Sequence, residues 1–264
     1  MLCVATLLAL APCLQVSASP GLQANPDPDA GRPVVLALPD GVDTISGGAP
    51  VQLVLDDGVA EAALSDAGQF IWFNRFTPDP ADFPFKLEEI QVVFGSSLVN
   101  VGDAVDLVIF EDTDGDGDPG TGSVHLATFN EVIQFADDAT FSVYSLATPV
   151  VLGGPGDVII GVINRYSSEG LFDFPARLDE SSSAVRSWAA SYLAGDVPDP
   201  PFFPADEQWG TVDSFGFPGN WVVRGFGTTL VPVEVPTFSS IGLALLVVLL
   251  AGSAWLFLRR RSAA

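Results

Sequence analysis

The sequence predicts an all-β fold, an antiparallel β-sandwich of jelly-roll type, with an N-terminal signal segment and one C-terminal transmembrane helix. From Val51 onward, short apolar or alternating runs recur, and turn-forming Gly, Pro and Asp separate them. No helical crossovers lie between these runs. Consecutive strands without crossover helices pair in antiparallel fashion, which favours a sandwich over a doubly wound sheet.

Nine strands are expected in this domain. The alternation of apolar residues is clearest around Ile90 and around Leu107. Only the run at 185–193 offers a helical alternative, because it carries several alanines. The expected strands are Val51–Leu55, Gln69–Phe76, Glu89–Phe94, Val105–Glu111, Val124–Phe129, Thr140–Ala147, Asp157–Asn164, Val185–Leu193 and Trp221–Thr228.

The C-terminal tail predicts a membrane span. Phe238–Leu258 is a run of 21 residues without a charge. At roughly 1.5 Å rise per residue, a helix of this length covers about 31 Å, enough for a hydrocarbon core of about 30 Å. Arg259, Arg260 and Arg261 follow, and a positive cluster at this place puts the end of the chain in the cytoplasm. We therefore expect the β domain outside the inner membrane.

A short motif lies at the start of the span, and its positions are Val235, Pro236, Thr237, Ser239 and Gly242. This motif resembles that of IPTL-CTERM sorting tails, a variant of the PEP-CTERM type of bacterial sorting tail. The resemblance covers about 30 of the 264 residues, and the sequence departs from the family pattern at Ser240 and Ile241. It implies an exosortase-like membrane protease as a partner, which would cut near the motif. A plain single-span anchor is the alternative.

The N-terminal segment is typical of export. The apolar run Leu2–Val16, followed by small residues up to Ala18, predicts a signal peptide. The two cysteines, Cys3 and Cys13, both lie in this segment, so the expected mature domain has no disulfide and no thiol ligand for zinc. The expected order is signal peptide 1–18, Pro/Gly/Asp-rich spacer 19–50 with at most one strand at Val34–Leu38, β-sandwich 51–229, linker and sorting motif 230–237, transmembrane helix 238–258, and Arg-rich tail 259–264.

The charge balance of the exported part is strongly acidic. Residues 19–237 hold all 33 acidic residues and 7 of the 10 basic residues, a net charge of −26. A field of this sign repels nucleic acid and anionic lipid head groups, so we expect no nucleic-acid partner. It also favours the binding of divalent cations.

One motif carries metal chemistry. Asp112, Asp114, Asp116 and Asp118 alternate with small residues, a spacing that folds several carboxylates around Ca²⁺, which takes six to eight oxygen ligands. The first half matches an EF-hand loop, but Ser123 stands at the twelfth position, where an EF-hand has glutamate. The flanks also read as strands. We therefore expect a structural Ca²⁺ site of the kind found in extracellular β proteins, with a solvated acidic turn as the alternative.

No catalytic constellation stands out, and we expect no enzymatic activity. His125 is the single histidine and falls in an expected strand, so it is a poor candidate for a Ser-His-Asp triad. Paired acids of a glycoside hydrolase are a less favoured possibility, because no spacing singles out one pair. The aromatics Trp209, Phe215, Phe217 and Trp221 are expected to pack in the core, with a sugar-stacking platform as the alternative.

These features together predict an exported envelope protein with a non-catalytic β-sandwich domain. The domain is expected in the periplasm on an inner-membrane anchor, with later processing to the outer surface or the extracellular matrix. The alternative function is a carbohydrate-binding or adhesion module, with extracellular polysaccharide as its partner and a calcium-ordered loop beside the binding site.

Overall fold

The structure, a computed structural model, describes residues 22–25, 32–33, 48–192, 196–204 and 208–230, and in the tail Leu249, Leu250 and Ser253. The expected signal peptide, the strand at Val34–Leu38, the sorting motif, most of the span and the three terminal arginines lie outside these residues. Among the residues described, no helix is both long and apolar enough to cross a membrane. The chain divides into two compact units, Met1–Leu230 and Val231–Ala264.

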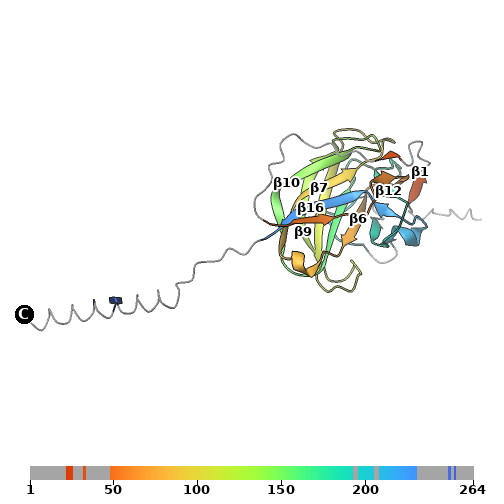
Figure 1. Cartoon of the computed structure of the whole chain (residues 1–264). Helices are drawn as coiled ribbons and strands as arrows, with labels where there is room; N and C mark the ends of the chain where they lie inside the picture. Colours follow the sequence, from red (N-terminus) through yellow and green to blue (C-terminus); the bar gives the residue numbers. More distant parts are fainter. Residues whose placement is uncertain are drawn as a thin grey trace, which may run out of the picture. The chain divides into compact units, whose positions relative to one another are not determined.

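In its described residues, the first unit contains antiparallel sheets and the short 3₁₀ helices η1 (Pro80–Asp82) and η3 (Val212–Phe215) (Figure 1). Its largest sheet has the strand order β14 (Trp209–Thr211), β13 (Ser187–Ser191), β6 (Phe70–Phe76), β11 (Asp157–Ile163), β8 (Ala104–Asp112) and β9 (Ser123–Val132). A four-stranded sheet has the order β10 (Phe141–Leu152), β7 (Phe85–Val93), β16 (Val223–Thr229) and β3 (Pro50–Leu53). A smaller sheet has the order β1 (Gln23–Asn25), β5 (Ala62–Ser65), β12 (Ala176–Asp179) and β15 (Asn220–Trp221), and β2 (Arg32–Pro33) pairs with β4 (Val59–Ala60).

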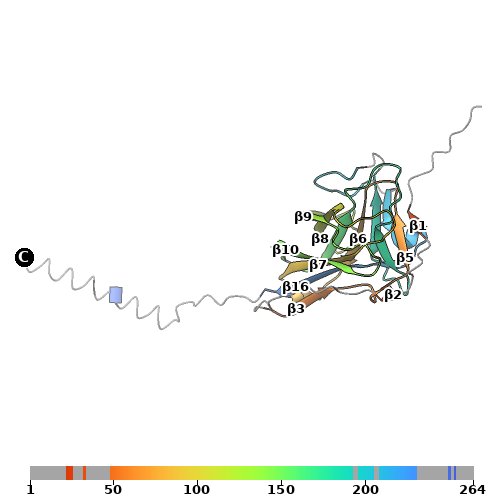
Figure 2. The ribbon, with the colours of Figure 1, turned by 90° about the horizontal axis from the view of Figure 1, so that it is seen from above.

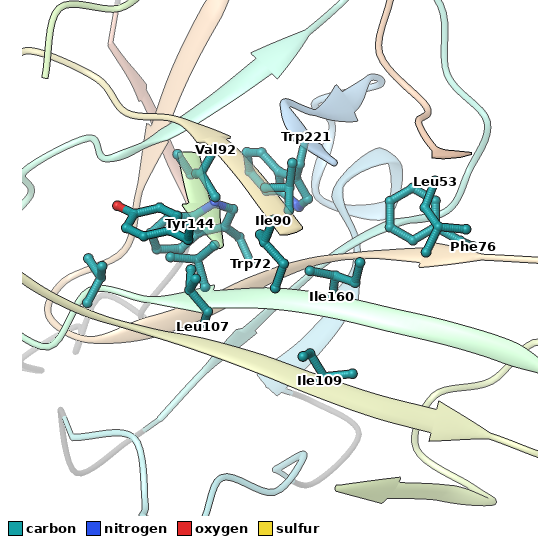
Figure 3. Close-up of a cluster of buried hydrophobic side chains, with 14 of the residues drawn as sticks. Leu53, Trp72, Phe76, Ile90, Val92, Leu107, Ile109, Tyr144, Ile160 and Trp221 are labelled. Carbon is teal, nitrogen blue, oxygen red and sulfur yellow. The ribbon is translucent and has the colours of Figure 1, made fainter. Parts of the chain in front are cut away.

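The two larger sheets pack face to face around the main hydrophobic core. Figure 2 shows β6, β8 and β9 in one layer and β3, β7, β10 and β16 in the other. Trp72 and Ile160 from the first layer point toward Ile90 and Tyr144 from the second (Figure 3), and all four side chains are buried. Burial of large side chains from both sheets gives the sandwich its main stabilisation.

The six-stranded sheet is also covered on its outer face. A second cluster of buried apolar side chains lies there, with Ile71, Phe73, Val108, Ile159 and Ile163 at its centre. The central strands are therefore buried on both faces, and every residue of β11 is buried. This double burial explains why the sequence of β11 is a continuous apolar run and not an alternating one.

Asn74 joins the sheets through hydrogen bonds in the core. Its side chain is fully buried, and Nδ2 donates to the carbonyl oxygens of Trp221 (2.8 Å) and Val223 (2.9 Å). The hydroxyl of Ser187 donates to Asn74 Oδ1 (2.6 Å) and accepts from the backbone N–H of Trp221 (3.0 Å). The carboxamide of Asn74 thus connects β6 with β13, β15 and β16. Its nitrogen and its oxygen both have hydrogen-bond partners, as buried polar atoms do in native structures.

The expected all-β class and antiparallel pairing are confirmed, and each of the nine expected strands overlaps a strand of the structure. The described part of the run at 185–193 contains strand β13 and no helix. Within residues 19–50, where at most one strand at Val34–Leu38 was expected, Gln23–Asn25 forms β1, which pairs with β5, and Arg32–Pro33 forms β2. The short strands β4, β5, β12 and β14 were also missed. The jelly-roll connectivity stays a prediction.

Replacing Asn74 with alanine should destabilise the domain strongly. The change leaves two buried carbonyls and one hydroxyl without their partner, and each such loss costs about 1–3 kcal/mol. We expect a fall of on the order of 3 kcal/mol or more in the free energy of unfolding, measured by urea titration. The exposed Asn100, changed to alanine, is the control and should shift stability by about 0.5 kcal/mol or less. Equal effects of the two variants would contradict this role of Asn74.

Candidate metal centre

The aspartate-rich loop joins β8 to β9 at one end of the six-stranded sheet. Asp112 is the last residue of β8, and the strand register places it directly opposite Asp157 of β11 on one side and Ser123 of β9 on the other. Residues opposite one another in an antiparallel pair have their side chains on the same face. The sheet itself therefore brings together Ser123 and Asp112, the twelfth and first positions of the loop.

Three of the four predicted aspartates come together. One carboxylate oxygen each from Asp112, Asp114 and Asp116 lie within 4.8 Å of one another. Oxygens on opposite sides of a Ca²⁺ ion are about 4.8 Å apart, because each lies about 2.4 Å from the ion. The group therefore has the dimensions of a calcium site. The fourth aspartate, Asp118, is not in this group, and its Oδ1 accepts a hydrogen bond from the backbone N–H of Gly120 (2.9 Å).

Asp112 is the buried member of the group. It is fully buried, whereas Asp114 and Asp116 are exposed. Neither carboxylate oxygen of Asp112 has a hydrogen-bond partner, and the buried hydroxyl of Ser123 has none either. A buried carboxylate without a partner is costly unless a cation compensates it. These atoms thus offer unused oxygen ligands on the protein side of the carboxylate group.

The electrostatics of the group follow from this crowding. Burial raises the pKa of Asp112 most, and the charges of Asp114, Asp157 and Asp116 add to the effect, so that the pKa rises from 3.8 to about 6. The N–H of Asp114 faces this carboxylate outside hydrogen-bond geometry and offsets part of the rise. The pKa of Asp116 is lowered instead, mainly because the backbone N–H of Asp118 donates to its carboxylate (2.7 Å).

The other buried aspartates of the domain have a basic partner or accept hydrogen bonds, as Asp66, Asp173 and Asp179 do. Asp157 pairs with Arg75 and also accepts from Thr77. Further ion pairs join Asp56 to Arg224, Asp106 to Arg165 and Asp138 to Arg177. Asp112 lacks such a partner, although its cross-strand neighbour Asp157 has one. Asp112, whose negative charge the protein compensates least, is thus the residue that lies beside two further carboxylates.

The loop backbone is shaped by its own aspartates and glycines. The carboxylates of Asp114, Asp116 and Asp118 each accept a hydrogen bond from the N–H two residues further on. Gly122 has φ +72°, and a methyl group built on it would lie 2.3 Å from Asp114 Oδ2 and 2.9 Å from Asp112 Oδ1. Only glycine leaves room at this point for the two carboxylates to approach the same place.

The other candidate residues have structural surroundings. The ring of His125 packs edge-on against Phe110 (5.2 Å between centroids), and its Nε2 lies 2.8 Å from Thr128 Oγ1. Trp221 is fully buried and donates from Nε1 to the carbonyl oxygen of Trp188 (2.8 Å). These positions favour packing roles over catalysis or sugar stacking.

The remaining aromatics of the alternative sugar-stacking platform do not form one exposed surface. Trp209 stacks on Trp188, with 5.0 Å between ring centroids, and Phe217 is partly buried against the main core. Phe215 is 38% exposed. A sugar platform needs several aromatic faces open to solvent together, so this arrangement favours the expectation of packing for Trp209 and Phe217.

A shallow hollow of about 220 Å³ lies between β3 and the turn that leads to η1. Its polar lining includes Asp79, Asp82 and Arg186. Asp79 caps η1 by accepting the N–H of Ala81 (2.8 Å), and Arg186 donates to Thr77 Oγ1 (2.7 Å). These groups are engaged in local structure, so the hollow offers less chemistry than the aspartate loop.

No protein-family model and no curated protein matches this chain. Two solved structures are similar in part. One contains the cysteine protease and lectin-like domains of Cwp84, a surface layer associated protein of Clostridium difficile, with 12% identity, a TM-score of 0.45, and coverage of 68% of this chain and 36% of that chain. The other is a cysteine-to-alanine variant of the clostridial cysteine protease Cwp84 after propeptide cleavage, with 12% identity, a TM-score of 0.44, and coverage of 68% and 40%. The chain spans less than half of either protein, and a likeness at this level supports no conclusion about function.

The calcium-free domain should lose stability as the pH rises through the titration of Asp112. Its pKa of about 6 in the folded state lies above the ordinary 3.8, so the folded protein keeps a proton that the unfolded chain has released. Stability therefore falls between about pH 4 and about pH 6 and then stays level. A difference of about 2 pKa units corresponds to roughly 3 kcal/mol as an upper limit.

The measurement is urea unfolding in a chelator at about pH 4.5 and about pH 7, on the wild type and on Asp112→Asn, which keeps the shape without the charge. The wild type should become less stable than the variant as the pH rises. A stability difference that stays constant across this range would contradict the raised pKa of Asp112.

Proposed function

We propose that the chain is an exported envelope protein whose non-catalytic β-sandwich domain binds a structural Ca²⁺ ion at Asp112, Asp114 and Asp116. The observation that carries the proposal is the fully buried carboxylate of Asp112. Both of its oxygens lack a partner, and it lies within 4.8 Å of two further carboxylates. A hard cation with oxygen ligands supplies what this group lacks.

The ion would act on stability and not on a reaction. The candidate ligands come from the end of β8 and from the loop that follows it. Ser123 of β9, which stands opposite Asp112, offers a further oxygen, its unpartnered Oγ. An ion held there would fix both ends of the β8–β9 connection. Two of the three aspartates, Asp114 and Asp116, are open to solvent. This suits a modest affinity of the kind found in extracellular modules, about 10⁻⁴–10⁻³ M.

Export and tethering rest on the sequence of the tail. The first compact unit ends at Leu230, where the linker to the sorting motif is expected to begin. The acidic charge of −26 over residues 19–237 suits a domain that stays soluble outside the cell and close to, but not adsorbed on, anionic lipid. We propose an inner-membrane tether through Phe238–Leu258 and processing by an exosortase-like protease.

Calcium should raise the melting temperature of the full chain in detergent. At millimolar calcium and a Kd of roughly 10⁻³–10⁻⁴ M, linkage predicts a gain on the order of 1 kcal/mol, or about 2–4 °C. The variant Asp114→Ala, Asp116→Ala removes two ligands and should not respond. The matched control, Glu169→Ala with Glu180→Ala, removes two exposed carboxylates elsewhere and should respond like the wild type. Identical melting temperatures with and without calcium in all three proteins would exclude the site.

Processing of the tail should leave a mature protein whose C-terminus lies upstream of Leu243. The expectation follows from Pro236 and Thr237 before an uncharged span and three arginines. Mass spectrometry of the C-terminal peptide from the cell surface measures it. Replacing the three arginines with glutamine should in addition weaken the fixed orientation of the span. Recovery of the intact arginine cluster in the surface fraction would leave a plain anchor.

A further inference from the structure

The outer face of the six-stranded sheet is covered by the side chains of Val197, Phe203 and Trp209, which we name the outer cap. Val197 is buried, and the rings of Phe203 and Trp209 pack against the same outer cluster. Phe203 lies against Phe73 and Phe110, with ring centroids 5.0 Å and 4.9 Å apart. The cap thus shields aromatic side chains of the sheet from water.

The beginning of the outer cap is held by polar contacts. Arg165 donates to the carbonyl oxygens of Val197 and Pro198, and it is itself paired with Asp106. The side-chain oxygen of Gln69 accepts the N–H of Val197 (3.2 Å). This end of the cap is therefore fixed by charge-assisted hydrogen bonds that do not involve the aspartate loop.

The other end of the outer cap is held by packing. Trp209 stacks on Phe203 with 5.7 Å between ring centroids, and its indole N–H is buried without a hydrogen-bond partner. Its ring also touches the aspartate loop, because a methyl group built on Gly120 would lie 2.4 Å from Trp209 Cζ2 and 2.8 Å from Cη2. The position of the loop backbone at Gly120 therefore bears directly on Trp209.

A chain of hydrogen bonds connects the metal ligands to Gly120. The N–H of Asp116 donates to Asp114 (3.1 Å), that of Asp118 to Asp116 (2.7 Å), and that of Gly120 to Asp118 (2.9 Å). Each carboxylate thus fixes the backbone two residues ahead of it. An ion that holds the first two carboxylates in place also fixes the backbone that packs on the indole ring. Without the ion, the like charges of the loop repel one another.

We propose that Ca²⁺ at Asp112, Asp114 and Asp116 controls the outer cap, by fixing Gly120 against Trp209 through the hydrogen-bonded loop. Calcium then decides how firmly the aromatic outer face of the sheet is covered. This inference rests on the proposed function, since it requires the ion to bind. It adds a regulatory role to that site, since the outer cap of the exported domain is then held firmly against the sheet only where calcium is present.

The test is hydrogen exchange of the full chain in detergent, with excess Ca²⁺ or with a chelator, followed by mass spectrometry of the peptides that cover Trp209–Thr211. Calcium should slow exchange in this strand about tenfold in the wild type, a change of about 1.4 kcal/mol in local opening. In Gly120→Val the added side chain displaces the indole ring while the aspartates remain. Calcium should still bind this variant, as measured by titration calorimetry, but should no longer slow exchange at Trp209–Thr211.

Gly153→Val is the matched control, because a side chain built at Gly153 meets nothing within 4 Å, and it should behave like the wild type. Should Gly120→Val fail to fold, the smaller change Gly120→Ala makes the same test. Calcium binding without slower exchange in the wild type would overturn the control of the cap and leave the proposed function standing, and so would slowing that persists in the Gly120 variants. Absence of any calcium binding in the calorimeter would overturn both.

Discussion

A buried aspartate needs a basic partner or hydrogen bonds, and this constraint shapes much of the domain. Only 7 of the 10 basic residues of the chain lie in residues 19–237, against 33 acidic ones. Four of the arginines are paired with buried or nearly buried aspartates, on strands or loops that lie far apart in the sequence. Each such pair costs stability if one partner is lost, because a buried charge is then uncompensated. The arginines therefore help to fix the layout of the loops.

Asp112 has neither a basic partner nor a hydrogen bond to its carboxylate oxygens. Its neighbour across the strand, Asp157, already binds Arg75, and the next charges within reach are negative. The sheet has thus buried a carboxylate at the edge of a loop that carries more carboxylates. An external cation resolves this arrangement without any further basic residue. The same reasoning explains why Ser123, a neutral oxygen ligand, stands opposite Asp112 in the ladder where an acid would add to the repulsion.

The strand pattern was largely readable from the sequence, because alternation and apolar runs report directly on burial. The short strands β1, β5 and β12 could not be predicted from the sequence, because their pairing is set by partners elsewhere in the chain and not by their own composition. The aspartate spacing likewise indicated a metal site. The sequence held no sign that Asp112 is buried and unpartnered, or that Asp118 turns toward Gly120, because both depend on how β8, β9 and β11 pair.

Trp209 illustrates the same limit. The sequence left it open to core packing or to a sugar-stacking role, and only the pairing of β13 with β14 places it beside Trp188. A stretch rich in Pro and Phe at 197–204 carries no period that would mark it as a cover for a sheet. Its role follows from the continuous apolar sequence of β11, which requires a cover on each face.

The repeated step of two residues in the aspartate loop constrains how its length can vary in evolution. Each carboxylate from Asp114 to Asp118 receives the N–H two positions ahead, so carboxylates and glycines occupy alternate places. Inserting a single residue would put a side chain where Gly120 meets the indole ring and shift every later acceptor out of phase. Inserting an Asp-Gly pair would preserve the phase. Loop lengths among descendants of this sequence should therefore differ in even numbers, and duplication of Asp-Gly units is the simplest genetic route to them.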